Sequence, residues 1–165
     1  MGEHKDPRFS VWYGNLQATM RSLQLIEREV EQATGLPMAS IEVLVNIGME
    51  DGGRIRMSEL ADTLLLSRGG ATRLVARLED AGLVEREIPR DDRRATFAVV
   101  TEKGAEMVGQ AVPILEGAAA RHYLDRLEPS ELSAIRGASL KILEDTGSNC
   151  DWLVDELRAA ADSEH

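Results

Sequence analysis

Cysteine, aromatic residues and long apolar runs are all scarce in this chain. Its 165 residues include one cysteine, two Trp, two Tyr and two Phe. A single cysteine excludes an internal disulfide, which fits a reducing cytosol. No run of about 18 apolar residues occurs, and the first ten residues lack the basic and apolar regions of a secretory signal. We therefore expect a cytoplasmic protein without a membrane partner, and its length favours one domain over residues 1–165.

Patterns typical of catalytic and metal sites are also missing. The sequence has no P-loop, no dinucleotide fingerprint and no Ser/His/Asp spacing. The histidines His4, His122 and His165 are scattered, which argues against a zinc site. We therefore expect no metal, no cofactor and no enzymatic activity. An enzyme that uses Cys150 or His122 is the least favoured alternative.

The acidic charge of the chain is unevenly distributed. A formal net charge of -10 would ordinarily argue against nucleic acid as a partner. From Arg54 to Arg94, however, nine arginines face eight acidic residues, a net charge of +1, so the other 124 residues carry -11. Every basic residue in that segment is arginine, the side chain best suited to phosphates and base edges. The sequence thus places a nearly neutral, arginine-rich segment between two acidic flanks.

Apolar spacing predicts three helices before or within this segment. The first is amphipathic, covers residues 9–32 and is ended by the sequence TGLP. The second covers residues 39–50 and is apolar on most sides, so it should be buried. The third is short, with Ser58 as its N-cap. Its apolar face is formed by Leu60, Ala61, Leu64 and Leu65.

A fourth predicted helix follows after a tight turn. Ser67 is its N-cap, Gly82 is its stop, and its apolar stripe is formed by Ala71, Leu74, Val75 and Leu78. The opposite face shows small residues and arginines, so the two helices have the helix-turn-helix pattern. The alternative interpretation is that this outward face is an ordinary solvent-exposed surface, on which Arg77 pairs with Glu79 or Asp80. We expect the outward residues to contact base edges or phosphates: Ser67, Arg68, Gly69, Gly70, Thr72, Arg73 and Arg77.

A β-hairpin is predicted directly after this helix. The runs LVEREI and ATFAVV are β-prone, and the loop PRDDRR between them carries a proline and an aspartate pair that favour a turn. A hairpin in this position would reach the minor groove that flanks the major groove read by the helix. We assign Arg94 to the minor groove, Arg90 and Arg93 to phosphates, and Asp91 and Asp92 to orienting these arginines.

Helices are again predicted after the hairpin. Thr101 can cap one that continues to about Leu127 and is bent at Pro113. Further helices are expected over residues 129–145 and 151–161. The fold class is therefore mainly α with a small β-hairpin.

The segment from SELADTLL to VTEKG resembles the winged helix-turn-helix of the MarR family of bacterial transcription regulators. Asp92, Arg93 and Arg94 match the family's Asp-x-Arg signature in the hairpin, or wing, and VTEKG matches its closing Leu-Thr-x-x-Gly. The chain departs from the pattern at Val100, where leucine is usual, and at Gly69 and Gly70, where a bulkier pair is common. The resemblance implies a DNA-binding lobe over residues 38–104 and dimerisation helices over residues 9–34 and 105–161.

This resemblance also implies a mode of action. It predicts a homodimer that binds a pseudo-palindromic site on double-stranded DNA as a repressor, and that is released by a small phenolic or anionic ligand. Trp12, Tyr13 and Arg21 are candidates to line the ligand crevice, although packing against the partner subunit is the favoured role for the aromatic pair. A redox sensor acting through Cys150 and a DNA-free interaction protein of the same fold remain alternatives.

Overall fold

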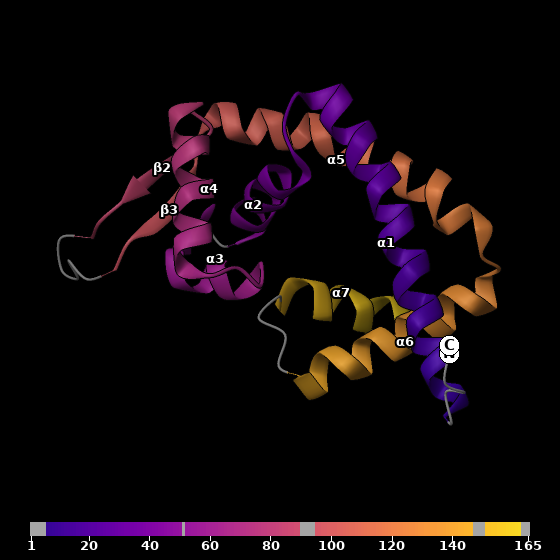
Figure 1. The fold of residues 1–165 in the computed structure, drawn as a ribbon. Helices are drawn as coiled ribbons and strands as arrows, with labels where there is room; N and C mark the ends of the chain where they lie inside the picture. The colour runs from indigo at the N-terminus through magenta and orange to yellow at the C-terminus, as the bar shows by residue number, and fades with distance from the viewer. Residues whose placement is uncertain (1–5, 51, 90–94, 147–150, 163–165) are drawn as a thin grey trace.

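The computed structural model describes residues 6–50, 52–89, 95–146 and 151–162. A lobe of three helices and a small sheet lies at one end, and long helices extend from it to the other end (Figure 1). No helix in the described ranges is long and apolar enough to cross a membrane. In chain order the elements are α1 (Pro7–Thr34), α2 (Met38–Met49), β1 (Arg54–Arg56), α3 (Met57–Thr63), α4 (Arg68–Asp80), β2 (Val84–Glu87), β3 (Phe97–Val100), α5 (Glu102–His122), the 3-10 turn η1 (Leu124–Arg126), α6 (Pro129–Thr146) and α7 (Asp151–Asp162).

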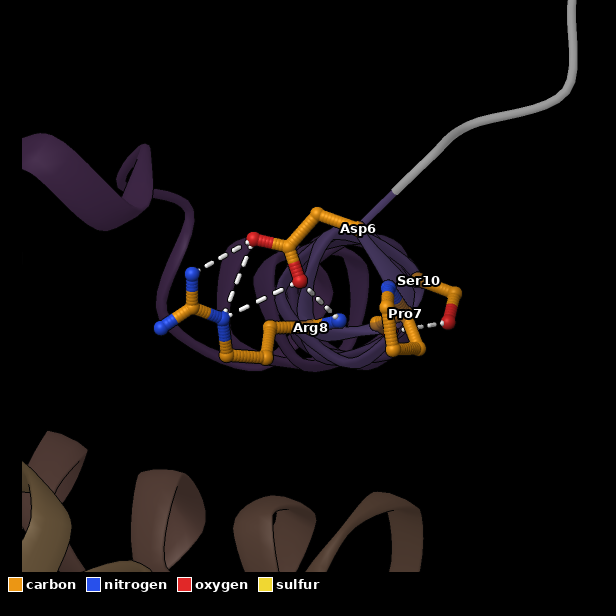
Figure 2. A network of polar contacts seen from close by, with 4 residues as sticks. All are labelled: Asp6, Pro7, Arg8 and Ser10. Carbon is orange, nitrogen blue, oxygen red and sulfur yellow. Dashed lines mark hydrogen bonds and ion pairs between the residues drawn. The ribbon is translucent and has the colours of Figure 1, made fainter.

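Helix α1 begins two residues before the predicted start because Asp6 caps it. The Asp6 carboxylate accepts hydrogen bonds from the Arg8 backbone N–H at 2.9 Å and from the Arg8 guanidinium at 2.7 Å (Figure 2). These bonds lower the pKa of Asp6, and Pro7 occupies the first helical position, where no N–H is required. At the other end Gly35 takes a φ of 72° and donates to the Glu31 carbonyl.

The entry into α3 differs from the sequence prediction, in which Ser58 was the cap. Helix α3 begins at Met57, so Ser58 lies inside its first turn. The reason is β1, a strand that the sequence analysis did not predict, because β1 pairs with β3 and brings the chain to the helix in extended form. Arg56 is therefore the N-cap, and its N–H donates to the Glu59 carboxylate at 3.3 Å.

The lobe has its own core, centred on α2. The predicted stripe of α4 faces this core: Ala71 and Val75 are fully buried, Leu78 is 1% exposed, and Leu74 packs at the margin. The inner side of the sheet adds Ile55, Val84 and Ala98. The remaining buried members are Val43, Leu44, Ile47, Leu60 and Leu83. Burial of this apolar stripe is the main reason that α4 holds its place in the lobe.

A second core joins α1, α2 and α5. Its buried members are Ile26 and Val30 of α1, Ile41 of α2, and Ala111 and Ala118 of α5. The small side chains of the two alanines let α5 approach α1 closely along much of its length. Helix α2 contributes to both cores, which connects the lobe to the long helices.

The sheet confirms the predicted hairpin and adds one strand to it. Strand β3 lies between β1 and β2, and both pairings are antiparallel. In the register, Arg86 of β2 stands opposite Ala98 of β3, and Glu87 stands opposite Phe97. The hairpin projects away from α5 at the edge of the lobe (Figure 1).

Helix α5 is capped as predicted but is shorter than expected. The Thr101 side chain accepts from the Gly104 N–H at 3.0 Å. The helix ends at His122, and a 3-10 turn over residues 124–126 replaces the predicted helical continuation to Leu127. The predicted later helices are present as α6 and α7, and Arg158 of α7 donates to the Glu144 carboxylate of α6 at 2.7 Å.

A polar contact holds the far end of α5 to α1. The Glu29 carboxylate accepts a hydrogen bond from Arg121, and its other oxygen lies 2.5 Å from Nε2 of His122. These two neighbours lower the pKa of Glu29 below its ordinary value of 4.5. Since the folded-state pKa is depressed, this contact stabilises the fold above that ordinary value and is lost as the pH falls through the folded-state pKa.

The variant Glu29→Gln tests this contact. We expect it to lower the melting temperature at pH 7, and we expect the difference from the unaltered chain to shrink as the pH falls below 4.5. Thermal denaturation from pH 7 to pH 3 is the measurement. Glu31→Gln, an exposed position on the same helix, is the control and should show a much smaller difference. A Glu29→Gln difference that is independent of pH would contradict the assignment.

Candidate nucleic-acid interface

Helix α4 exposes nearly all of the residues that the sequence analysis assigned to DNA. Its apolar stripe is buried, and the other face is open to solvent. Gly70 is partly buried, and the exposed members of the set are Ser67, Arg68, Gly69, Thr72, Arg73 and Arg77. Glu79, which the alternative reading paired with Arg77, instead lies 3.6 Å from Nε of Arg86. The arrangement leaves the arginines of α4 directed outward from the lobe.

The N-terminal turn of α4 explains one of its two glycines. Ser67 is the N-cap, as predicted, and its hydroxyl accepts from the Gly70 N–H at 3.1 Å. A Cβ at position 70 would lie 3.3 Å from that hydroxyl oxygen, so Gly70 fits the cap closely. A Cβ at position 69 would meet only the end of the flexible Arg73 side chain, at 3.7 Å. The lobe itself therefore has room for a larger side chain at the exposed position 69.

The hydroxyl of Thr72 has one hydrogen-bonding role already filled. It donates to the Arg68 carbonyl at 2.8 Å, one turn earlier in the helix. The oxygen keeps its acceptor capacity and the methyl group stays available. In a major groove this side chain is therefore suited to accept from an amino group of adenine or cytosine, or to pack on a thymine methyl.

The prediction that Leu65 belongs to the apolar face of the third helix is wrong, because Leu65 lies in the turn before α4. Helix α3 ends at Thr63, and Leu65 has a φ of 52°, which makes it the one non-glycine residue with positive φ in the part of the chain that the structure describes. Its exposed fraction is 93%. Because the backbone takes a left-handed conformation there, the middle leucine of the run Leu64–Leu66 points into solvent while Leu64 packs on the core.

The sequence between β2 and β3 contains three predicted DNA contacts and the two aspartates predicted to orient them. Arg90, Asp91, Asp92, Arg93 and Arg94 lie outside the described residues. The described strands nevertheless show where the loop begins and ends, since β2 and β3 leave the lobe beside α4 (Figure 1). The strands that lead into and out of this loop therefore lie next to α4 (Figure 1).

The outer side of the sheet carries a basic group that was not predicted from the sequence. The Arg54 guanidinium lies 4.1 Å from the centroid of the Phe97 ring, and that of Arg56 lies 5.3 Å from it. Arg54 also lies 3.3 Å from the Glu87 carboxylate. The alternating sequence RIR, with Ile55 buried between the two arginines, was the available signal for this strand and its two faces.

The aromatic residues at the start of α1 gather on its surface. The ring centroids of Trp12 and Tyr13 are 6.2 Å apart, and Phe9 stacks on Tyr13 at 6.0 Å. Trp12 is 57% exposed and Tyr13 is 49% exposed. Arg21, also exposed, lies about two helical turns further along. The structure thus brings the aromatic pair together with Phe9 rather than with Arg21.

No group of three or more metal-ligating side chains occurs within residues 6–50, 52–89, 95–146 and 151–162. His122 is engaged with Glu29, and Cys150 is outside the described residues. The described part of the chain thus presents arginines and small residues on α4, and the contact chemistry available there is that of phosphates and base edges.

Comparison with known proteins identifies this arrangement. The model of the MarR family matches residues 34–95. The transcriptional repressor MprA of Escherichia coli K12 is 33% identical over 82 residues, which are 50% of this chain and 47% of MprA. The chain thus spans about half the length of this curated relative.

Two solved structures match over most of their length. AbsC, a MarR family transcriptional regulator from Streptomyces coelicolor, aligns with a TM-score of 0.79 at 32% identity, covering 88% of this chain and 98% of AbsC. Sco3205, a MarR family transcriptional regulator from the same organism that was solved in complex with DNA, aligns with a TM-score of 0.75 at 29% identity. The alignment covers 82% of this chain and 88% of Sco3205. The chain therefore belongs to the MarR family of transcriptional regulators.

Proposed function

We propose that this chain is a homodimeric repressor that reads a pseudo-palindromic DNA site with α4 in the major groove and the hairpin loop in the minor groove. The observation that carries the proposal is the exposed face of α4, where Arg68, Thr72 and Arg73 stand opposite the apolar stripe that packs on the core. The similarity to Sco3205, which was solved in complex with DNA, supports the same use of the fold. Arg90, Arg93 and Arg94 supply the contacts of the loop, oriented by Asp91 and Asp92.

Dimerisation is proposed from the apolar surface of α1. The first 17 residues of this helix leave large apolar side chains open to solvent: Phe9, Val11, Trp12, Tyr13, Met20 and Leu23. Several large apolar side chains exposed on one helix favour a protein interface there. Two-fold symmetry would then set the two α4 helices about 34 Å apart, the distance between successive major grooves on one side of a duplex.

Release by a small phenolic or anionic ligand completes the proposal. The ligand would bind more tightly to a form of the dimer in which the spacing of the lobes does not match successive major grooves. It would weaken DNA binding by the ratio of its affinities for this form and for the DNA-binding form. Trp12, Tyr13 and Arg21 are the candidate ligand contacts, with packing against the partner subunit as the favoured role of the aromatic pair. The protein would act in the cytoplasm.

Selection from a random-sequence duplex pool, followed by salt titration of the selected site, tests this function. We expect tight binding of two chains per site and a steep fall of log affinity with log salt between about 50 and 200 mM. Arg94→Ala should weaken binding to all DNA sequences. It should also make the slope of log affinity against log salt less steep by about 1 for each lost phosphate-type contact. Arg73→Ala should cost about 1–3 kcal/mol at the preferred bases and relax the selected sequence.

The matched control is Arg28→Ala, which removes an exposed arginine of α1 far from α4. It should leave the salt slope and the selected sequence unchanged. Absence of any selected site, even at low salt, would refute the proposal and favour the DNA-free interaction protein. Loss of binding on peroxide treatment that is absent in Cys150→Ser would favour the redox sensor.

A further inference from the structure

Arg86 of β2 reaches across to α4 and contacts it at two points. Its Nη2 donates to the backbone carbonyl of Thr72 at 3.0 Å, and its Nε lies 3.6 Å from the Glu79 carboxylate. Thr72 and Glu79 are seven residues apart, so they lie two turns apart on the same side of α4. The side chain of Arg86 is 29% exposed, much less than those of the arginines on the outer face of α4. One side chain of the hairpin therefore spans two turns of the helix.

The two contacts differ in strength. The ion pair with Glu79 is long and partly open to water, so it contributes little. The bond to Thr72 is charge-assisted, and its acceptor is a carbonyl in the middle of the helix, beside the side chain assigned to the DNA bases. Arg86 thus binds α4 at the point where the position of the helix matters most for base contact.

Apolar packing alone would leave the angle between the hairpin and α4 loosely defined. Val75, Leu78 and Val84 hold the two elements together through burial, which is not directional. A hydrogen bond from a planar guanidinium is directional. Arg86 stands opposite Ala98 on the inner side of the sheet and so connects the sheet to α4 within the lobe.

We propose that Arg86 is a positioning residue that fixes the hairpin relative to α4, so that loop and helix engage neighbouring grooves of one duplex together. This inference rests on the proposed DNA binding. With the bond intact, the loop is presented at the minor groove as soon as α4 binds, and little ordering entropy is lost. Without it, the loop contacts form only after the hairpin is reoriented.

Arg86→Met, which keeps the length of the side chain and removes its donors, is the test variant. We expect about tenfold weaker binding to the selected duplex with an unchanged salt slope, because Arg86 bonds to protein and not to phosphate. In the Arg86→Met background, Arg94→Ala should weaken binding by a clearly smaller factor than it does in the unaltered chain. Arg86→Lys should restore only part of the affinity, since an ammonium cannot span both contacts.

Lys103→Met is the matched control. Lys103 also donates to a carbonyl at the end of α4, that of Ala81, at 2.8 Å, but it extends from α5 and not from the hairpin. The Lys103→Met variant should change the melting temperature about as much as Arg86→Met does and should leave the affinity for DNA unchanged. If Arg86→Met reduced the salt slope by about 1 and did so equally in the Arg94→Ala background, Arg86 would contact a phosphate directly and the proposal would fail. Independent effects of Arg86→Met and Arg94→Ala on affinity would likewise overturn it.

Hydrogen exchange without DNA separates this inference from the proposed function. Arg86→Met should accelerate exchange of the hairpin amides in β2 and β3, and Lys103→Met should not. If no DNA site is selected but the hairpin amides respond in this way, the proposed function fails and the structural link stands. Unchanged hairpin exchange in Arg86→Met would overturn the link itself.

Discussion

Replacing Gly104 by alanine is expected to destabilise the fold by about 3 kcal/mol or more, because among the glycines that the structure describes its added Cβ would meet the nearest neighbour. A Cβ at position 104 would lie 2.1 Å from the backbone carbonyl oxygen of Leu83 and 2.8 Å from Cγ2 of Val100. The first contact is with backbone, so it can be relieved only by separating α5 from the loop after α4. Thermal or urea denaturation measures the loss.

The control for this substitution lies on the same helix. A Cβ at Gly109 meets nothing within 4 Å, so Gly109→Ala should stabilise the chain by about 0.5–1 kcal/mol through the lower entropy of the unfolded state. The two glycine-to-alanine changes therefore have opposite expected signs. Equal melting temperatures for the two variants would contradict the close approach at Leu83.

This close approach gives a physical reason for the motif Thr-x-x-Gly at the start of α5. The Thr101 hydroxyl accepts from the Gly104 N–H and donates to the Gly82 carbonyl at 2.8 Å, and the Thr101 N–H donates to the Leu83 carbonyl at 3.1 Å. The threonine thus joins the helix cap to the loop after α4, and the glycine lets the two backbones meet. Both residues serve the junction between the lobe and α5.

The second large effect is expected from Leu78→Ala, which should lower the free energy of unfolding by about 2–5 kcal/mol. Leu78 is 1% exposed and belongs to the core of the lobe. Its removal leaves a cavity directly behind the face of α4 that carries Arg73 and Arg77. Urea denaturation with an unchanged m-value is the measurement.

Leu65→Ala provides the matched comparison, since it makes the same chemical change at a position that is 93% exposed. Its effect should stay within about 0.5 kcal/mol. If the two leucine substitutions proved equally costly, α4 would not be anchored through the buried stripe that the structure shows.

Local pattern in the sequence was sufficient to predict α4 and its cap. The buried positions of α4 recur at helical spacing and Ser67 precedes them, so short-range information determines this element. The hairpin was predictable for the same reason, since two β-prone runs are joined by a turn-forming loop. The start of α5 followed from Thr101, whose side chain caps it as expected.

Features that depend on distant partners were not predictable in this way. Strand β1 has three residues and forms only because β3 lies beside it, about forty positions later in the chain. This strand moved the cap of α3 from Ser58 to Arg56. The contact of Arg86 with Thr72 likewise joins two elements whose spacing along the chain carries no signal. The direction of Leu65 depends on one backbone angle in the turn.

Helix α5 joins the lobe to α1 and is held at both of its ends as well as through the core that it shares with α1. Its first turn packs Gly104 against Leu83 in the lobe, and its last turn holds Glu29 of α1 through Arg121 and His122. Its 21 residues correspond to a length of about 30 Å, so a tilt of about 10° at the α1 end moves the lobe end by about 5 Å. Base pairs rise by about 3.4 Å each, so in the proposed DNA complex a tilt of this size would displace α4 by more than one base pair.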